Sequence, residues 1–214
     1  GDVNRDAPKP KPKPPDMSSL PLDDPHEWFE AWFDEASALQ IAYPNAVTLA
    51  TVSPDGEPMA RQVLLKDHDP SGYVFYTNYN SQKGQHLAET PKAALNFYWE
   101  QLDYQIRIKG RVEKLSADAS DAYFATRDRD SQLGAWASDQ STELESREAL
   151  ESAVEEYRQK FDGEDVPRPD HWGGYRVVPN RYEFWRAGAH RLHDRWEFTR
   201  ASLEDAWTRR RLHP

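Results

Sequence analysis

The sequence contains no cysteine. This absence excludes disulfide bonds, thiolate catalysis, iron–sulfur clusters and zinc sites that use cysteine ligands. No apolar run reaches the roughly 20 residues that span a bilayer, and the start lacks the basic-then-apolar pattern of a secretion signal. We therefore expect a cytoplasmic protein, and we expect no metal site.

Positive charge is in the minority, with 27 Lys and Arg residues against 37 Asp and Glu residues and a formal net charge of −10. The resulting pI near 5.2 argues against nucleic acid or an anionic membrane as the main partner. Local basic clusters remain compatible with this balance. An anionic small molecule is therefore still an allowed ligand.

The first nineteen residues differ in composition from the rest. Pro8 to Pro15 alternates proline with lysine, so alternate residues lack an N–H and neither a helix nor an inner strand can form. We expect residues 1–19 to be an extended or disordered arm. No internal repeat divides the remainder, so residues 20–214 are expected to form one domain.

Ordered structure is predicted to resume at Asp24-Pro25, a helix cap followed by proline at the first helical position. Phe29, Trp32 and Ala36 then repeat with helical spacing, which indicates an amphipathic helix to about Leu39. Further helices are expected over residues 83–89, 116–126, 129–138 and 146–161.

The hydrophobic period changes to two from Ala46 onward, as in residues 104–112, where apolar and polar side chains alternate. Strands are expected over residues 46–52, 59–66, 73–77 and 104–112, and then over 174–178, 181–185, 195–199 and 206–212. Successive antiparallel strands of this kind are typical of a small barrel. The expected fold is therefore mainly β with peripheral helices, an α+β arrangement.

Two cationic segments stand near each other in the sequence. Arg61 and Lys66 are an odd number of residues apart on one strand, so they point to opposite faces and can serve two different anions. Ser81 to Lys83 opens a helix after a strand, where free N–H groups and a lysine favour phosphate. An ordinary serine cap explains the second segment equally well.

Later polar residues extend this set. Tyr123, Arg127 and Ser131 recur at four-residue intervals and would present three phosphate donors on one helix face, unless the helix breaks near Asp128. Gln105 on the polar face of its strand, and Gln140-Ser141 after a helix, offer amide and hydroxyl groups; each alone is also typical of a surface residue.

Arg191-Leu-His-Asp-Arg195 follows the aromatic segment Tyr182 to Trp185 after a short turn. Two guanidiniums and an imidazole beside a tryptophan suit a planar, anionic ligand better than a protein core. A solvated charged turn is the plainer interpretation of this segment taken alone.

Together these segments resemble the pyridoxine/pyridoxamine 5'-phosphate oxidase family, in the same order and at similar spacing. The matching blocks are RQVLLK at 61–66, FYTN at 75–78, SQLGAWASDQS at 131–141, WGGYRV at 172–177, EFW at 183–185 and RLHDR at 191–195. The resemblance implies a split β-barrel homodimer with FMN at the subunit interface. It implies oxidation of pyridoxine or pyridoxamine 5'-phosphate to pyridoxal 5'-phosphate, with electrons passed to O2 as hydrogen peroxide.

The resemblance also assigns residues. The implied cofactor contacts are Arg61, Lys66, Tyr76, Thr77, Gln82, Lys83, Gln105, Gln140, Ser141, Trp185 and Arg195. The implied substrate contacts are Lys66, Tyr123, Arg127, Ser131, Arg191 and His193, of which Arg191 and His193 are the catalytic candidates over the substrate ring. Two positions depart from the family pattern: Gln82 stands where the family usually has Arg, and Tyr43 stands where it often has an acidic residue.

Two other classes of protein stay open. A flavin oxidase of the phenazine-biosynthesis type would share the barrel and the FMN site but act on a larger ring substrate, for which a phosphate-binding set has no purpose. A non-catalytic flavin-binding protein would keep Arg61 and Lys83 but would not need Arg191 or His193.

The homodimer has a second basis in the first predicted helix. Trp28, Phe29, Trp32 and Phe33 are more aromatic surface than one helix of a small barrel readily buries, which favours burial against a second subunit. The arm has no aromatic side chain to stack on a substrate, so we expect residues 1–19 to be dispensable for flavin binding and nearly dispensable for turnover.

Overall fold

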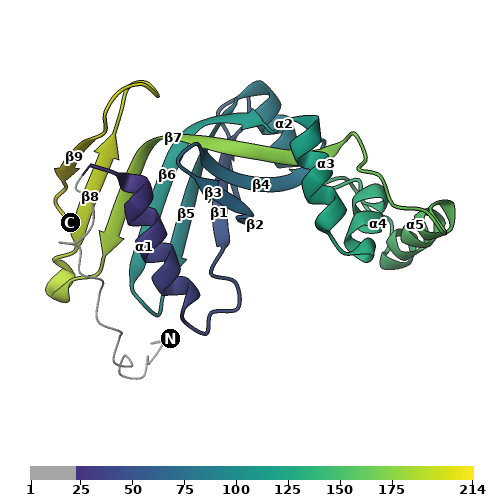
Figure 1. The fold of residues 1–214 in the computed structure, drawn as a ribbon, viewed down its shortest axis with the longest axis horizontal. Coiled ribbons are helices and arrows are strands. Elements are labelled where there is room, and N and C mark those ends of the chain that lie inside the picture. Colours follow the sequence, from purple (N-terminus) through teal and green to yellow (C-terminus); the bar gives the residue numbers. More distant parts are fainter. Residues whose placement is uncertain (1–22) are drawn as a thin grey trace.

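The computed structural model describes residues 23–214 (Figure 1). The predicted arm at residues 1–19 lies outside this range. Six helical segments occur in the described range: α1 (Pro25–Ser37), α2 (Gln82–Glu89), α3 (Ala117–Thr126), α4 (Arg129–Ala137), α5 (Arg147–Lys160) and the short 3-10 helix η2 (Ala189–Arg191). The same range holds nine strands: β1 (Ala46–Val52), β2 (Pro58–Leu64), β3 (Asp67–Asp69), β4 (Gly72–Asn78), β5 (Lys92–Trp99), β6 (Tyr104–Lys114), β7 (Trp172–Arg186), β8 (Asp194–Thr199) and β9 (Thr208–Arg211).

All nine strands belong to one antiparallel sheet, whose main order is β2-β1-β5-β6-β7-β4-β3. The two ends of this order, β2 and β3, are consecutive in the chain. Between them the Leu65 N–H donates to the carbonyl of Asn45 beside β1, and the Lys66 N–H donates to the carbonyl of Val74 in β4. The chain thus crosses from one edge of the sheet to the other, which requires the sheet to curl into a half-barrel. The predicted mainly β barrel fold is confirmed.

The β7 strand connects the half-barrel to its C-terminal extension. It pairs with β6 along one side, while β4 and then β8 occupy successive parts of its other side. The prediction of two strands, over 174–178 and 181–185, was wrong because Pro179 and Asn180 lie in a bulge and do not end the strand. Gly110 pairs with Pro179 and Lys109 with Arg181, so Asn180 is the extra residue. A Cβ on Gly110 would lie 1.8 Å from the carbonyl oxygen of Val178, so the bulge needs glycine there.

The helix α1 lies across one face of the sheet (Figure 1). Asp24 caps it and Pro25 opens it, as predicted. Trp28, Phe29 and Trp32 are at most 2% exposed, because Trp28 packs on Phe184 and its neighbours in β8 and Trp32 packs on Tyr104. The expectation that this aromatic face needs a second subunit was therefore wrong, since the half-barrel of the same chain covers it.

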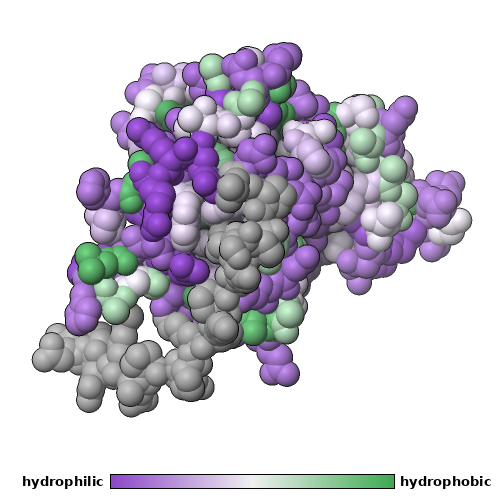
Figure 2. Space-filling view, turned by 60° about the vertical axis from the view of Figure 1, so that its left-hand side comes forward, coloured by the Kyte–Doolittle hydropathy of each residue, from purple (hydrophilic) through white to green (hydrophobic). Residues whose placement is uncertain are grey.

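The helices α3, α4 and α5 gather at one end of the sheet, and β8 and β9 lie at the other (Figure 1). A small second core holds the three helices against β7, with Phe124, Leu133 and Trp172 at its centre. In the view of Figure 2 the surface is mostly hydrophilic, with hydrophobic residues only scattered over it. Within the described range, no helix has both the length and the apolar character needed to cross a membrane.

Candidate functional site

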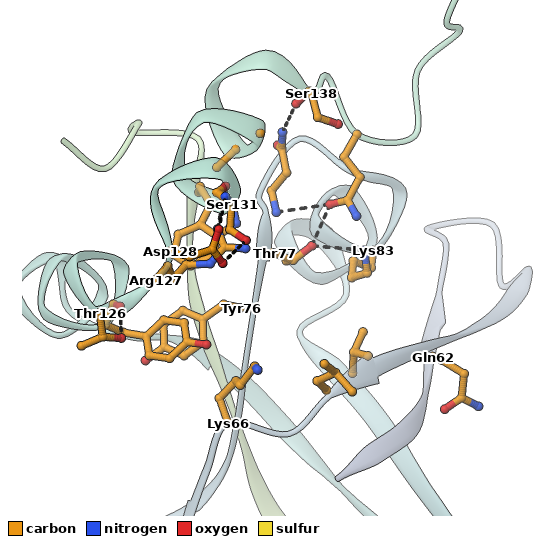
Figure 3. A pocket seen from close by; sticks show the side chains of 18 residues that line it. Gln62, Lys66, Tyr76, Thr77, Lys83, Thr126, Arg127, Asp128, Ser131 and Ser138 are labelled. Carbon is orange, nitrogen blue, oxygen red and sulfur yellow. Dashed lines mark hydrogen bonds between the residues drawn. The ribbon is translucent and has the colours of Figure 1, made fainter. Parts of the chain in front are cut away.

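A cavity of about 790 Å³ opens where β4, the start of α2, α3 and α4 meet (Figure 3). Predicted site residues from five separate segments line it: Lys66, Tyr76, Thr77, Lys83, Tyr123, Arg127, Ser131 and Gln140. Gln62 also lines it, although no sequence pattern selects this residue, and Figure 3 shows its side chain pointing away from Lys66 and Tyr76. The structure therefore brings most of the predicted phosphate-binding side chains to one cavity.

Arg61 and Lys83 lie together at the start of α2, and every acceptor they use within the described range is neutral. Arg61 donates to the Leu49 carbonyl, to Thr51 and to Gln82, and Lys83 donates to the hydroxyl of Thr77. Burial lowers the pKa of Arg61, and burial together with the charge of Arg61 lowers the pKa of Lys83. Both cations are partly desolvated and lie near a helix N-terminus. A bound anion would therefore stabilise their charged forms.

A second cationic group lies across the cavity, where α3 ends. The helix break near Asp128 occurs as the sequence allowed: Arg127 caps the end of α3 and Asp128 caps the start of α4. The Arg127 guanidinium lies 4.6 Å from the ring centre of Trp172, and burial lowers its pKa. Within the described range its hydrogen bond goes to a backbone carbonyl, that of Ser131. The Ser131 hydroxyl itself donates to Asp128 in this structure.

Aromatic rings form one wall of the cavity. Tyr76 stacks on Tyr123 with ring centres 3.8 Å apart, and Trp172 lies nearly parallel to both, with its ring centre 5.4 Å from that of Tyr76 and 6.2 Å from that of Tyr123. The stack joins β4, α3 and β7, and it supports Arg127 through the face of Trp172. It thereby fixes the direction in which the Arg127 charge faces. Trp172 lies in one of the matching sequence blocks, but only the structure shows its contact with Arg127.

Gln140 joins the loop after α4 to β4. Its side-chain oxygen accepts hydrogen bonds from the Thr77 hydroxyl and the Asn78 N–H, and Asn78 also donates to the carbonyl of Ser138. The neighbouring Ser141 is exposed and has a positive φ of 71°. Three predicted residues, Thr77, Lys83 and Gln140, therefore form a continuous hydrogen-bonded chain beside the cavity.

The remaining predicted residues form a second cluster. Gln105, Trp185 and Arg195 lie directly opposite one another on β6, β7 and β8. His193 packs on Trp185 with ring centres 4.8 Å apart, and its Nδ1 accepts a hydrogen bond from the Gly188 N–H. Arg191 is exposed on the intervening turn.

The turn carrying Arg191 is strained. His190 and Arg191 have positive φ values of 59° and 64°, which non-glycine residues rarely adopt in succession. Gly188 is required at its start, because a Cβ there would lie 2.0 Å from the Leu192 carbonyl oxygen. Strain of this kind is common at binding sites, and no sequence pattern predicts it here.

The two clusters are far apart within one chain. Tyr76 pairs with Gly174 near the start of β7, whereas Trp185 lies near its end. At the usual rise of a β-strand, the eleven intervening steps span on the order of 35 Å. A second cavity, of about 500 Å³, is lined by Tyr43 and by Tyr98, the strand partner of Gln105, and it shares Gln62 with the first cavity. One chain therefore carries two partial sites.

Comparisons with known proteins agree with this geometry. Residues 33–161 match the family model described as pyridoxamine 5'-phosphate oxidase, and residues 172–214 match the one described as the pyridoxine 5'-phosphate oxidase C-terminal dimerisation region. A protein named pyridoxine/pyridoxamine 5'-phosphate oxidase from Trichormus variabilis is 51% identical over 199 residues, 92% of each chain. Proteins of the same name from Gloeothece citriformis and Cupriavidus necator are 57% and 55% identical, over 80% and 89% of each chain.

Solved structures share the fold. PhzG from Burkholderia lata, crystallised with tetrahydrophenazine-1-carboxylic acid, is 32% identical, with a TM-score of 0.84 over 91% of this chain and 94% of that chain. A pyridoxamine 5'-phosphate oxidase-related, FMN-binding protein from Nostoc punctiforme has a TM-score of 0.72 over 89% of this chain and 98% of that chain; at 17% identity it supports the fold alone.

The curled antiparallel sheet, which PhzG shares, places the chain in the class of β half-barrel proteins. Within that class the chain belongs to the pyridoxamine 5'-phosphate oxidase family, as the extent of both family matches and the relatives at about half identity show.

Proposed function

We propose that this protein is an FMN-dependent oxidase that converts pyridoxine 5'-phosphate or pyridoxamine 5'-phosphate to pyridoxal 5'-phosphate. O2 accepts the electrons and leaves as hydrogen peroxide; the amine substrate also takes up water and releases ammonia. One observation carries the proposal. Two cationic groups lie at the cavity: Lys83, which lines it and has Arg61 nearby, and Lys66 with Arg127, which both line it. Within residues 23–214 none of these cations pairs with a carboxylate. Two phosphates, one on the cofactor and one on the substrate, match this arrangement.

FMN fits the first group. A terminal phosphate would neutralise Arg61 and Lys83 at the start of α2, and Thr77, Gln82, Gln140 and Ser141 supply neutral hydrogen-bonding groups around it. No glycine-rich dinucleotide loop is present in the sequence, which favours FMN over FAD or NAD. When bound, FMN supplies the two-electron acceptor that the side chains lack.

The substrate phosphate fits the second group. Lys66, Tyr123, Arg127 and Ser131 would hold it beside the aromatic wall. Arg191 and His193 would lie over the substrate ring, and the remaining polar groups would orient the reacting carbon toward the cofactor. Ser131 would have to release Asp128 to donate to the phosphate.

The site is completed by a second copy of the chain. In this proposal the protein is a homodimer, and Gln105, Trp185, Arg191, His193 and Arg195 of one subunit reach the cavity of the other. The support is the separation of the two clusters within one chain and the match of residues 172–214 to a dimerisation region. A cytoplasmic location stays a prediction.

A phenazine-type oxidase is the second candidate, favoured by the similarity to PhzG. The cationic pair of Lys66 and Arg127 argues against it, because a phenazine precursor has no phosphate to occupy that pair. A non-catalytic flavin protein is the third candidate, and the strained turn carrying Arg191 argues against it.

The test is oxidation in air by the purified, FMN-loaded protein. Pyridoxine 5'-phosphate and pyridoxamine 5'-phosphate should each yield pyridoxal 5'-phosphate and hydrogen peroxide in equal amounts. Unphosphorylated pyridoxine, the matched control, should react far more slowly. Denaturation should release FMN. A protein that binds FMN but leaves both phosphates unchanged would contradict the oxidase proposal, and release of FAD would contradict the cofactor assignment.

A further inference from the structure

The guanidinium of Arg61 is held along one side by a fixed set of acceptors. Its Nη1 donates to the Thr51 hydroxyl at 2.6 Å and to the Leu49 carbonyl at 3.2 Å, and its Nη2 donates to Gln82 at 3.3 Å. Its Nε makes no hydrogen bond within the described range. The edge formed by Nε and Nη2 is therefore the edge that can meet an anion in a two-point contact.

Thr51 is the central member of this set, and it is fully buried. Its hydroxyl also lies 2.9 Å from Nδ1 of His86. Because a guanidinium can only donate, the hydroxyl accepts from Arg61, and it keeps capacity for a second hydrogen bond with His86. The chain of hydrogen bonds therefore runs from Arg61 through Thr51 to His86.

The helix α2 closes this chain into a ring. Gln82 and His86 are four residues apart, so they lie on the same face of the helix. Gln82 accepts a hydrogen bond directly from Arg61, and His86 is linked to Arg61 through the Thr51 hydroxyl. The arrangement ties Arg61 on β2 to both ends of α2.

We propose that Thr51 and His86 are positioning residues for flavin-phosphate binding, which hold Arg61 in the orientation that presents its Nε edge to the phosphate. Neither residue touches the cofactor. The inference rests on the proposed function, because it takes Arg61 as a phosphate ligand. It goes further in assigning part of the affinity for the phosphate to a buried hydroxyl and an imidazole that no sequence pattern selects.

Thr51→Val tests the hydroxyl. Valine keeps the shape of threonine and removes the hydrogen bonds, and Thr51→Ser, the matched control, keeps the hydroxyl. The measurement is the dissociation constant of the full-length protein for FMN and for riboflavin, which lacks the phosphate, by quenching of flavin fluorescence. We expect Thr51→Val to weaken FMN binding about tenfold. Riboflavin binding should stay unchanged, and Thr51→Ser should stay near wild type.

A second pair of variants tests the imidazole independently. Asn can place a hydrogen-bonding atom near the position of Nδ1, so His86→Asn should retain the preference for FMN over riboflavin. His86→Leu has no hydrogen-bonding group and should lose about as much of that preference as Thr51→Val.

The outcomes separate the two claims. Equal weakening of FMN and riboflavin binding, or no weakening by Thr51→Val, would overturn the positioning role. Failure of the wild-type protein to bind FMN more tightly than riboflavin would overturn the flavin-phosphate site itself.

Discussion

At the scale of single residues, Arg127 in the cavity differs from the arginines that cluster on Glu183. Arg107, Arg181 and Arg195 all pair with Glu183, whereas Arg127 rests on the ring of Trp172 and has no carboxylate ion pair within the described range. A guanidinium kept half-buried without a counter-ion lowers stability unless a ligand supplies the charge. We interpret this cost as the structural signature of the substrate-phosphate site.

Arg127→Ala tests that interpretation. The Michaelis constant for pyridoxine 5'-phosphate should rise about 10- to 100-fold, since a hydrogen bond to a charged group contributes about 1.5–3 kcal/mol. FMN content should stay near normal, because Arg61 and Lys83 are intact. Arg147→Ala is the control, since Arg147 is exposed on α5 and its one ion pair within residues 23–214 is with Glu151. An unchanged Michaelis constant in Arg127→Ala would place the phosphate elsewhere.

Arg191 and His193 should act on the reacting ring. Alanine at either position should lower the catalytic rate constant more than it weakens binding of pyridoxal 5'-phosphate, because interactions that strengthen in the transition state affect rate more than ground-state affinity. Steady-state kinetics and product titration give the two quantities. Leu192→Ala is the matched control on the same turn, as Leu192 is 68% exposed. A change in the Michaelis constant alone would make both residues binding residues only.

At the scale of elements, Glu183 holds the second cluster together. It is 2% exposed and accepts from Arg107 on β6, from Arg181 on β7 and from Arg195 on β8. Burial alone would raise its pKa, but the hydrogen bonds from Arg195 and Arg107 outweigh burial and lower it. Its stabilising contribution is therefore complete above the ordinary carboxyl pKa and is lost as the pH falls through the lowered value.

Glu183→Gln should lower the free energy of unfolding by about 2 kcal/mol or more near neutral pH, because the arginines lose their shared counter-charge. The difference from wild type should shrink as the pH falls below about 4. Urea denaturation at both pH values measures it. Glu113→Gln, at a half-exposed carboxylate on β6 with a lowered pKa of its own, should cost much less at neutral pH. A pH-independent difference for Glu183→Gln would contradict the ionic account.

Most elements could be predicted from the sequence, because period and caps are local signals. Asp24 and Pro25 gave the start of α1, and Tyr104 to Val112 gave β6 by alternation. What failed was non-local. Proline usually ends a strand, so Pro179 predicts a break. Only its pairing opposite Gly110 shows that β7 continues through a bulge. Similarly, the aromatic face of α1 gave no indication of which surface buries it.

The candidate site shows the same division. Lys66 and Trp185 could be named from matching blocks of sequence, and Arg127 from its four-residue spacing to Tyr123 and Ser131. Thr51 and His86 could not, because a threonine in an apolar strand and a histidine in a short helix carry no pattern. Their link to Arg61 exists only once β1, β2 and α2 are packed together.

At the scale of the whole molecule, the placement of the two clusters decides whether one chain alone can form a complete site. The cavity with Lys66, Lys83 and Arg127 lies at the end where the helices gather, and β8, which carries Arg195 opposite Trp185, lies at the other end of the same sheet (Figure 1). A ligand the size of FMN cannot reach both within one chain. In the proposed homodimer, each flavin site would therefore combine one cluster from each of two subunits.

Complementation between two defective chains measures this claim most directly. Lys83→Met damages the first cluster and Arg195→Leu the second, so each variant alone should purify as a dimer, by light scattering, with little FMN. Co-expressed chains pair at random, and each mixed dimer should contain one site with both clusters intact. The account predicts that the co-expressed protein regains FMN at about a quarter of its sites. FMN content no higher than that of the separate variants would contradict a site shared between subunits.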